Sequence, residues 1–293
     1  MYERIEECPI CTNTDLRNSL ICKDYLVSQQ SFAISICSSC GLLITNPRPS
    51  KETISQFYDS SSYLSHNSDG SLMSRLYSLA QRYTLWYKFR LVKRLAKPGN
   101  RLMDYGCGVG QFMQYMQSNK YQVTGIEPSD IGLSKARSKE LLVYQTLSEA
   151  KESESKFDVI TLWHVLEHVH DLNTTIKQLK KLLNKDGYLV IALPNTKSWD
   201  AQHYKENWAA YDVPRHLFHF DDENIKMLLK SNRLSFVQKA PLYLDSFYIS
   251  LLSETHLNNG NKILKSIING CKSNIYGSRT SQYSSMIYIF QKK

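Results

Sequence analysis

The sequence predicts an α/β fold, a seven-stranded, mostly parallel, doubly wound sheet preceded by a small N-terminal module. Two observations predict the sheet. A short apolar strand ends at Asp104 and leads into a turn with three alternate glycines and then an amphipathic helix. A second apolar run ends at the acidic Glu127. Alternate glycines let backbone N–H groups approach a ligand, and an acidic residue in this place accepts hydrogen bonds from ribose hydroxyls, so the unit is expected to hold a nucleoside.

Three motifs, in this order and spacing, resemble those of class I S-adenosylmethionine-dependent methyltransferases. They are the glycine loop with Glu127, a fourth-strand segment at 157–169 and a fifth-strand segment at 185–195. The resemblance covers roughly residues 75–293 and implies the Rossmann-like methyltransferase fold, with S-adenosylmethionine as cofactor. The residues that it places at the cofactor are Asp104, Tyr105, Gly106, Cys107, Gly108, Gly110, Gln111, Phe112, Glu127, Pro128, Thr146, Leu147, Trp163 and His164.

The remaining strands follow in the order of this family. Residues 141–147 are expected as the third strand, 236–239 as the sixth and 286–290 as the seventh, the last two forming an edge hairpin. Family members often carry an acidic residue near the third strand that contacts the adenine amine, and none stands at that place here. Backbone groups around Thr146 and Leu147 are the alternative adenine contacts.

The composition is that of an ordinary globular protein, with 42% hydrophobic and 22% charged residues. Because long apolar runs and an apolar signal region are both missing, we expect a cytoplasmic protein without a transmembrane segment. The net charge of +9 suits phosphorylated or nucleotide-linked substrates, nucleic acid or an anionic membrane. The basic residues form no long block, so nucleic acid is not the expected partner and a small-molecule substrate is.

Two C-x-x-C pairs within residues 1–49 are typical of a four-thiolate zinc ribbon. The expected ligands are Cys8, Cys11, Cys37 and Cys40. A closed four-sulfur site is structural, and in so short a segment the zinc would supply much of the folding free energy. The alternative, which the spacing disfavours, is four unrelated free cysteines. The other cysteines are expected not to bind the metal: Cys22, Cys107 and Cys271.

Residues 50–98 are expected to form a linker and a helix ahead of the methyltransferase domain at 99–293. The stretch 50–70 is polar and serine-rich, which indicates a linker able to fold over the active site. Residues 71–96 repeat apolar groups at helical spacing, and this helix is expected either beside the cofactor or simply packed on the sheet. A zinc ribbon followed by this kind of linker and a methyltransferase domain is similar to bacterial methyltransferases of sugar and surface-polysaccharide modification.

Three polar residues follow the fourth strand at helical spacing: His164, Glu167 and His168. If the chain is helical from Val165 onward, all three face one side. His164 could line the cofactor pocket or act as a base. The three together could hold a divalent metal, like a related acidic pattern in ubiquinone-type O-methyltransferases, or Glu167 and His168 could be packing and capping groups. Trp163 is expected to pack against the adenine or a neighbouring strand.

Residues 196–220, an expected insertion beyond the fifth strand, concentrate aromatic, histidine and arginine side chains. They follow the carboxyl edge of the predicted sheet, where ligands bind in open α/β folds. Arg215 is expected to pair with an anionic group of the substrate, and His216 or His219 to act as the base that takes a proton from a hydroxyl. The alternative is that these residues only fix the loop.

A second insertion, at 241–284, precedes the last strand. Its residues 241–275 carry an aromatic and aliphatic face with Lys262, Lys265 and Lys272. This segment could be a dimer surface, a substrate lid or an interfacial membrane element, and the sequence does not separate these alternatives.

The resemblance implies in-line displacement of a methyl group from a sulfonium, in which the enzyme mainly positions and desolvates the reactants. The first hypothesis is transfer to a small, anionic metabolite such as a nucleotide- or lipid-linked sugar, with O-methylation favoured by the histidines near the site. The alternative is an RNA methyltransferase that docks nucleic acid with its zinc ribbon, but only Arg17 and Lys23 are basic between the two cysteine pairs. A non-catalytic cofactor-fold binding module is a third reading, which the intact glycine loop disfavours.

Overall fold

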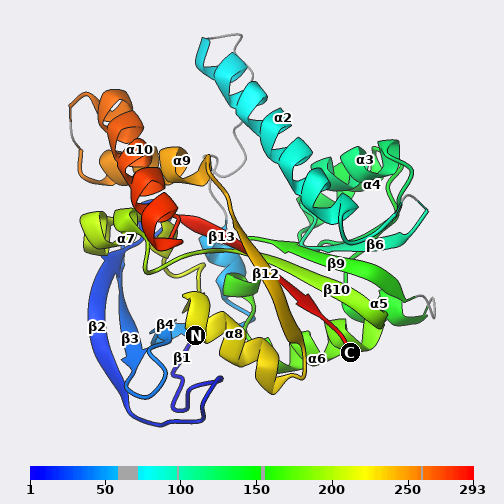
Figure 1. The fold of residues 1–293 in the computed structure, drawn as a ribbon. Helices are drawn as coiled ribbons and strands as arrows, with labels where there is room; N and C mark the ends of the chain where they lie inside the picture. Colours follow the sequence, from blue (N-terminus) through cyan, green and yellow to red (C-terminus); the bar gives the residue numbers. More distant parts are fainter. Residues whose placement is uncertain (59–71, 98, 153–155, 259) are drawn as a thin grey trace.

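A computed structural model of the protein describes residues 1–58, 72–97, 99–152, 156–258 and 260–293. Most of the expected serine-rich linker lies outside these residues. Figure 1 shows two regions, the large sheet with its helices and, beside it, the N-terminal strands together with the two insertions.

The large sheet has the strand order β12-β13-β10-β9-β6-β7-β8 (Figure 1). Its strands are β6 (Arg101–Tyr105), β7 (Gln122–Ile126), β8 (Val143–Tyr144), β9 (Phe157–Trp163), β10 (Leu183–Pro194), β12 (Ser235–Pro241) and β13 (Ser285–Gln291). Strands β8, β7, β6, β9 and β10 run parallel, and β13 pairs antiparallel with both β10 and β12. The predicted seven-stranded, mostly parallel sheet with an edge hairpin is confirmed.

Helices cover both faces of this sheet. They are α2 (Leu72–Lys93), α3 (Gln111–Ser118), α4 (Asp130–Arg137), α5 (Leu147–Glu152), α6 (Leu172–Leu182) and α8 (Asp222–Ser231). α2 and α3 pack on the face that carries Leu102 and Val190, and α6 and α8 pack on the face that carries Ile160 and Ile191. Because both faces are buried, β9 and β10 are nearly continuous apolar runs, as is usual for parallel sheets.

The N-terminal strands share a sheet with a distant part of the chain. This sheet has the order β11-β4-β3-β2, from β2 (Leu16–Lys23), β3 (Ser31–Cys37), β4 (Leu43–Thr45) and β11 (Phe218–His219). A separate pair, β1 (Tyr2–Glu3) and β5 (Arg48–Pro49), and the 3-10 helix η1 (Ile54–Phe57) complete the module. Phe218 lies opposite Ile44, and Thr45 Oγ1 donates to the carbonyl of His216 at 2.6 Å. The N-terminal module is therefore built together with the insertion at 196–220.

The first insertion consists of short elements: α7 (Trp199–Tyr204), the 3-10 helices η3 (Lys205–Asn207) and η4 (Ala209–Tyr211), and β11. Trp208 and Tyr211 are buried in a core that they share with Phe32 and Ile34 of the N-terminal module. Most aromatic residues of this insertion thus hold the N-terminal module in place instead of lining an open cleft. The second insertion forms α9 (Asp245–His256) and α10 (Lys262–Thr280), which pack against each other (Figure 1).

Candidate cofactor and acceptor site

The glycine loop joins β6 to α3 at the carboxyl edge of the large sheet. Gly106 has φ +75°, and a Cβ there would lie 2.5 Å from Val165 Cγ2, so no larger residue fits. A Cβ on Gly108 would meet nothing within 4 Å, so the outer side of the loop is open. Gly110 is the N-cap of α3, and as a glycine it has no side chain to compete with a ligand for the first N–H groups of the helix.

Glu127 follows β7 and is 8% exposed. Its Oε2 accepts a hydrogen bond from the N–H of Gly108 at 2.7 Å, and its Oε1 accepts one from the N–H of Ser129 at 2.9 Å. These bonds fix the carboxylate against the glycine loop, and each oxygen keeps a lone pair for a further donor. The carboxylate and the open loop together fit the ribose of an adenosine ligand.

Asp104 and Lys88 bring opposite charges to the inner side of the site. The side chain of Asp104, a residue of β6, is buried. Thr161 Oγ1 donates a hydrogen bond to its Oδ1 at 2.6 Å. Burial raises the pKa of Asp104 to about 7, against the effects of the Thr161 bond and the Lys88 charge. Burial lowers the pKa of Lys88, against the charges of Asp245 and Asp104. Lys88 was missed in the sequence because α2 carries several basic residues and no spacing distinguishes this one from the others.

Trp163, the last residue of β9, packs edge to face on Phe112, with ring centroids 5.2 Å apart. The ammonium of Lys88 lies 4.4 Å from the centre of the Trp163 ring. Trp163 Nε1 is buried and has no hydrogen-bond partner among the described residues. A buried donor without a partner at the edge of the site is suited to an acceptor atom of a ligand.

The other predicted cofactor residues lie around the loop or after β8. Those around the loop are half-buried or exposed: Tyr105, Cys107, Gln111 and Pro128. Thr146 Oγ1 donates to Glu149 Oε1 at 2.9 Å, and the side chain of Leu147 is buried in the core. A contact of Leu147 with an adenine would therefore have to come from its backbone.

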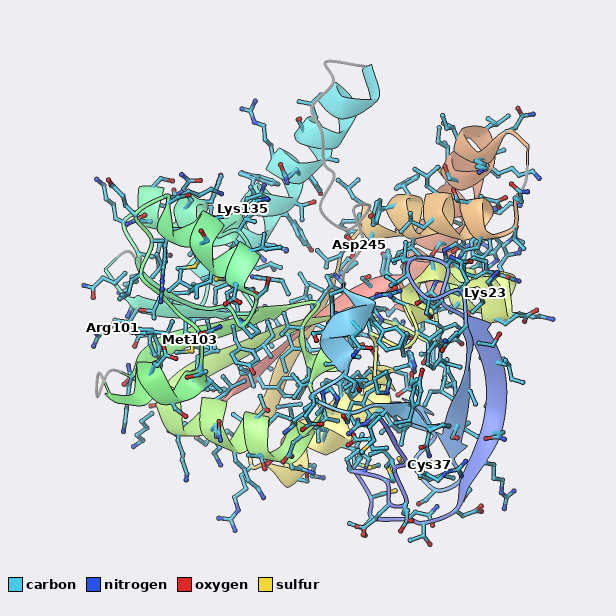
Figure 2. The ribbon with its side chains drawn as sticks, turned by 180° about the vertical axis from the view of Figure 1, so that it is seen from behind. Lys23, Cys37, Arg101, Met103, Lys135 and Asp245 are labelled. Atoms are coloured by element: carbon cyan, nitrogen blue, oxygen red, sulfur yellow. The ribbon has the colours of Figure 1, made fainter. Side chains whose placement is uncertain are left out.

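His164 has a left-handed backbone with φ +56°, which is uncommon for a residue other than glycine. Its Nε2 lies 3.0 Å from Asp245 Oδ2, and its Nδ1 lies 3.5 Å from Glu167 Oε1. Burial alone would lower the pKa of His164, but the hydrogen bonds and charges of these two carboxylates raise it to about 9. The imidazole is therefore protonated at neutral pH in this arrangement. Asp245, labelled at the start of α9 in Figure 2, was not predicted as a site residue.

The chain after His164 does not continue as the predicted helix. It forms only the 3-10 turn η2 (Leu166–His168). His168 Nδ1 lies 2.9 Å from Tyr58 Oη and 3.0 Å from the carbonyl oxygen of Arg215. Its partners thus differ from those of His164. The condition for a shared helical face of the three polar residues, an α-helix from Val165 onward, is not met.

Glu167 and His168 are grouped with a histidine from the first insertion. Ligand atoms of Glu167, His168 and His216 all lie within 4.8 Å of one another. Glu167 is 1% exposed, and neither carboxylate oxygen has a hydrogen-bond partner among the described residues. Although burial opposes it, the 3.5 Å contact with His164 and the charges of the nearby histidines lower the pKa of Glu167. One carboxylate and two imidazoles form a donor set that suits a divalent cation.

Arg215 is 1% exposed, and protein groups surround its guanidinium. Its Nη2 lies 3.0 Å from Asp24 Oδ1 and 2.6 Å from Asp212 Oδ1, and its Nη1 donates to the carbonyl of Phe57 at 3.0 Å. These contacts join the insertion to the N-terminal module. The geometry does not support the expectation that Arg215 pairs with a substrate anion, because the guanidinium is buried among its own partners.

His216 and His219, the other candidate bases of this loop, are also buried. His216 Nδ1 lies 2.8 Å from the carbonyl oxygen of Ala210, and His219 Nε2 lies 3.0 Å from Thr45 Oγ1. Burial and the charge of His216 lower the pKa of His219 well below its usual value, so this imidazole is neutral. The geometry favours structural roles for both, since the N-terminal module covers the loop that carries them.

The four cysteines of the two C-x-x-C pairs converge in the N-terminal module, where Figure 2 labels Cys37. The sulfurs of Cys8 and Cys40 lie 3.5 Å apart, as do those of Cys11 and Cys37, and all four lie within 4.8 Å of one another. Burial raises the pKa of Cys8 to about 11, so without a cation this thiol resists ionisation. Four converging sulfurs form the donor set that zinc prefers. The predicted convergence is confirmed.

A family model described as a methyltransferase domain matches residues 79–239, more than half of the chain. The chain belongs to this methyltransferase family. The predicted enzyme class is thereby confirmed, and the matched segment of the methyltransferase includes the glycine loop, Glu127 and His164. In the part of the methyltransferase that the structure describes, every helix is too short or too polar to cross a membrane.

Two relatives are both ubiquinone biosynthesis O-methyltransferases. The one from Rhodopseudomonas palustris (strain BisA53) is 27% identical over 161 residues, which are 49% of this chain and 62% of the relative. The one from Pelagibacter ubique (strain HTCC1062) is 35% identical over 101 residues, 32% of this chain and 42% of the relative. The chain thus spans less than two thirds of the length of these relatives.

Two solved structures share the fold. Magnesium protoporphyrin IX methyltransferase from Synechocystis PCC 6803 with bound SAH has a TM-score of 0.55 at 15% identity, and the match covers 83% of this chain and all of that one. Phosphoethanolamine N-methyltransferase 2 from Haemonchus contortus in complex with S-adenosyl-L-methionine has a TM-score of 0.50 at 15% identity and covers 85% of this chain and 62% of that one. At such low identity these matches show the methyltransferase fold alone.

Proposed function

We propose that this methyltransferase transfers a methyl group from S-adenosylmethionine to a hydroxyl oxygen of a small-molecule acceptor. The observation that carries the proposal is the pair of His164 and Asp245 beside the glycine loop, 3.0 Å apart. When bound, S-adenosylmethionine supplies an already activated methyl group, so the protein contributes position, desolvation and a proton acceptor. A hydroxyl acceptor must lose a proton, and an imidazole held by a carboxylate is suited to take it.

The cofactor half of the site follows from the geometry of the loop. In this proposal Glu127 accepts hydrogen bonds from the ribose hydroxyls, and the open backbone around Gly108 lies against the cofactor. Phe112 and Trp163, packed edge to face, form an apolar wall. Asp104 and Lys88 set the charge on the inner side of the site, close to that wall.

The acceptor half centres on His164. Its Nε2–H remains bonded to Asp245, which fixes the ring orientation and the tautomer. The Nδ1 contact with Glu167 is long at 3.5 Å, so an acceptor hydroxyl can replace it and give its proton to Nδ1. Because the pKa of His164 is raised to about 9, this step becomes faster as the pH rises toward that value. Asp245 acts as a positioning residue.

The proposed acceptor differs from the one expected from the sequence: the hydroxyl oxygen is kept and the anionic sugar is not. The relatives are O-methyltransferases by name, which supports oxygen as the acceptor atom. Their names contain no sugar, and Arg215 is engaged by Asp24 and Asp212, so we do not carry the anionic sugar into the proposal.

The test is an acceptor screen with methyl-labelled S-adenosylmethionine and the full chain, using phenolic and catecholic lipids, nucleotide-linked sugars and total RNA. A labelled methyl ether of a small molecule supports the proposal. Label on an amine or a carbon atom, or on RNA, overturns it. His164→Gln should abolish transfer while cofactor binding remains. His203→Gln, which changes an exposed histidine of α7, is the matched control and should leave turnover unchanged.

We also propose that a structural zinc ion occupies the four-cysteine cluster. The sulfur distances and the donor set support it. The cluster takes no part in the transfer, because four thiolates complete the coordination of zinc and leave no position for a reactant. In this proposal the zinc ion stabilises the two cysteine turns of the N-terminal module. That module covers the first insertion.

A further inference from the structure

The hairpin of α9 and α10 buries small and polar residues, and α10 exposes its apolar ones. The residues that α9 and α10 bury are mainly small or polar: Ser246, Ser250, Ser253, Ser266, Asn269, Gly270, Ser273 and Gly277. A helix on the surface of a globular protein normally buries its apolar stripe and exposes its polar face. Here the arrangement is reversed for α10, whose buried residues are all small or polar.

Close backbone approach explains the small residues between the helices. Ser246 Oγ donates to the carbonyl of Gly270 at 3.2 Å, and a Cβ on Gly270 would lie 2.4 Å from the Phe247 ring. Asn269 Nδ2 donates to Glu254 Oε1 at 3.0 Å and to Tyr204 Oη at 2.9 Å. Small contact residues and polar bonds between helices are the packing mode of helices that have apolar surroundings.

The apolar residues of α10 face outward. They are Ile263, Leu264, Ile267, Ile268 and Ile275, each between 44% and 59% exposed. These positions fall on one side of the helix, opposite the buried small residues, and Leu257 before the helix is exposed as well. A contiguous exposed aliphatic stripe of this kind marks an interaction surface.

The charged residues beside the aliphatic stripe indicate which kind of surface it binds. Between residues 262 and 280 the chain has four basic residues and no acidic one. Lys265, Lys272 and Arg279 recur at every seventh position, which places them in a row along one border of the aliphatic stripe. The acidic residues of α9 lie inward, with Asp245 on His164 and Glu254 on Asn269. The outer side of the hairpin is therefore apolar with a basic border.

We propose that the α9–α10 hairpin docks on an anionic lipid surface, with α10 lying flat, its aliphatic stripe among the acyl chains and its basic row on the headgroups. An aliphatic face bordered by lysine and arginine is the signature of a helix that lies in a membrane interface. Antiparallel pairing with a second copy is disfavoured because a twofold axis across the helices would bring the two basic rows together. Lysine is also depleted from protein interfaces, where aromatic residues are enriched.

The test is flotation of the full chain with vesicles of phosphatidylcholine alone or mixed with phosphatidylglycerol. Wild type should float only with the anionic vesicles, and less at raised salt. Lys265→Glu with Lys272→Glu should weaken the binding by more than about thirtyfold, since the loss of each basic residue near an anionic surface removes about a fivefold factor and each new carboxylate adds repulsion. Ile263→Ser with Ile267→Ser should weaken it at least about tenfold. Ile21→Ser in β2 and Lys181→Glu in α6, both exposed, are the matched controls and should not change flotation.

A second readout uses Cys271, which is exposed on the outer side of α10. An environment-sensitive fluorophore on this thiol, with Cys271→Ser as the labelling control, should shift to the blue with anionic vesicles only. Unchanged melting temperatures of the variants verify that they fold. Equal binding to neutral vesicles, indifference to the variants, or a dimer in light scattering that the Ile263→Ser and Ile267→Ser variant dissociates, without vesicle binding, overturns the proposal.

Discussion

Replacement of Arg215 by methionine tests whether the buried ion pairs of this residue stabilise the folded protein. The change removes the cation between two carboxylates, of which Asp24 is fully buried and Asp212 is 19% exposed. Loss of one partner of a buried ion pair costs about 3 to 5 kcal/mol of unfolding free energy. Asp24 keeps hydrogen bonds from Leu26, Ser28 and their neighbours, which stabilise its charge. We therefore expect the lower end of this range, about 3 kcal/mol.

The measurement is urea unfolding of the full chain, analysed by linear extrapolation. Arg17→Met is the matched control, because Arg17 also lies 2.6 Å from a carboxylate, that of Asp15, but the two side chains are 71% and 47% exposed. This control should leave stability unchanged. Adding Asp24→Asn to Arg215→Met should recover part of the loss. A loss below about 1 kcal/mol would refute the reasoning from burial, and unchanged stability with a raised KM for the acceptor would restore the substrate role of Arg215.

Three further predictions concern the cofactor, the base and the metal. Glu127→Ala should raise the Kd for S-adenosylmethionine about tenfold to hundredfold, because ribose hydroxyls and the N–H of Gly108 lose a charged acceptor; an unchanged Kd by calorimetry would disprove the ribose assignment. Asp245→Asn should lower the pKa of His164 from about 9, so the rising limb of kcat/KM against pH should move to lower pH while the maximal rate falls; a limb that stays in place would contradict the pairing. Elemental analysis should find zinc in wild type and less in Cys37→Ser, and chelation should lower the melting temperature of wild type; a metal-free protein of equal stability would exclude the structural zinc.

The large sheet could be predicted because its signals are local. The loop after β6, the acidic Glu127 after β7 and the apolar run of β9 each lie within a short stretch whose spacing has one physical interpretation. The convergence of the four cysteines was predictable for the same reason, since each C-x-x-C pair forms its own turn.

The roles of the first insertion could not be predicted, because they depend on residues far away in the sequence. Arg215 looks like an anion-binding residue until Asp24 and Asp212 are seen beside it. His164 was a candidate base in the sequence, but its partner Asp245 lies in the second insertion, where no spacing connects the two. For His216 and His219, the sequence of the loop does not indicate whether another part of the protein buries them.

The pairing of β4 with β11 has a consequence for how the protein is made on the ribosome. Thr45 bonds to His216 across 171 residues, whereas Cys8 and Cys40 meet across only 32. The cysteine turns can therefore close early in synthesis, but the edge of β4 stays without its neighbour until most of the chain has emerged. During that interval β4 keeps an unpaired edge. The two cysteine turns, together with the zinc ion proposed for them, are the contacts that can already order the module.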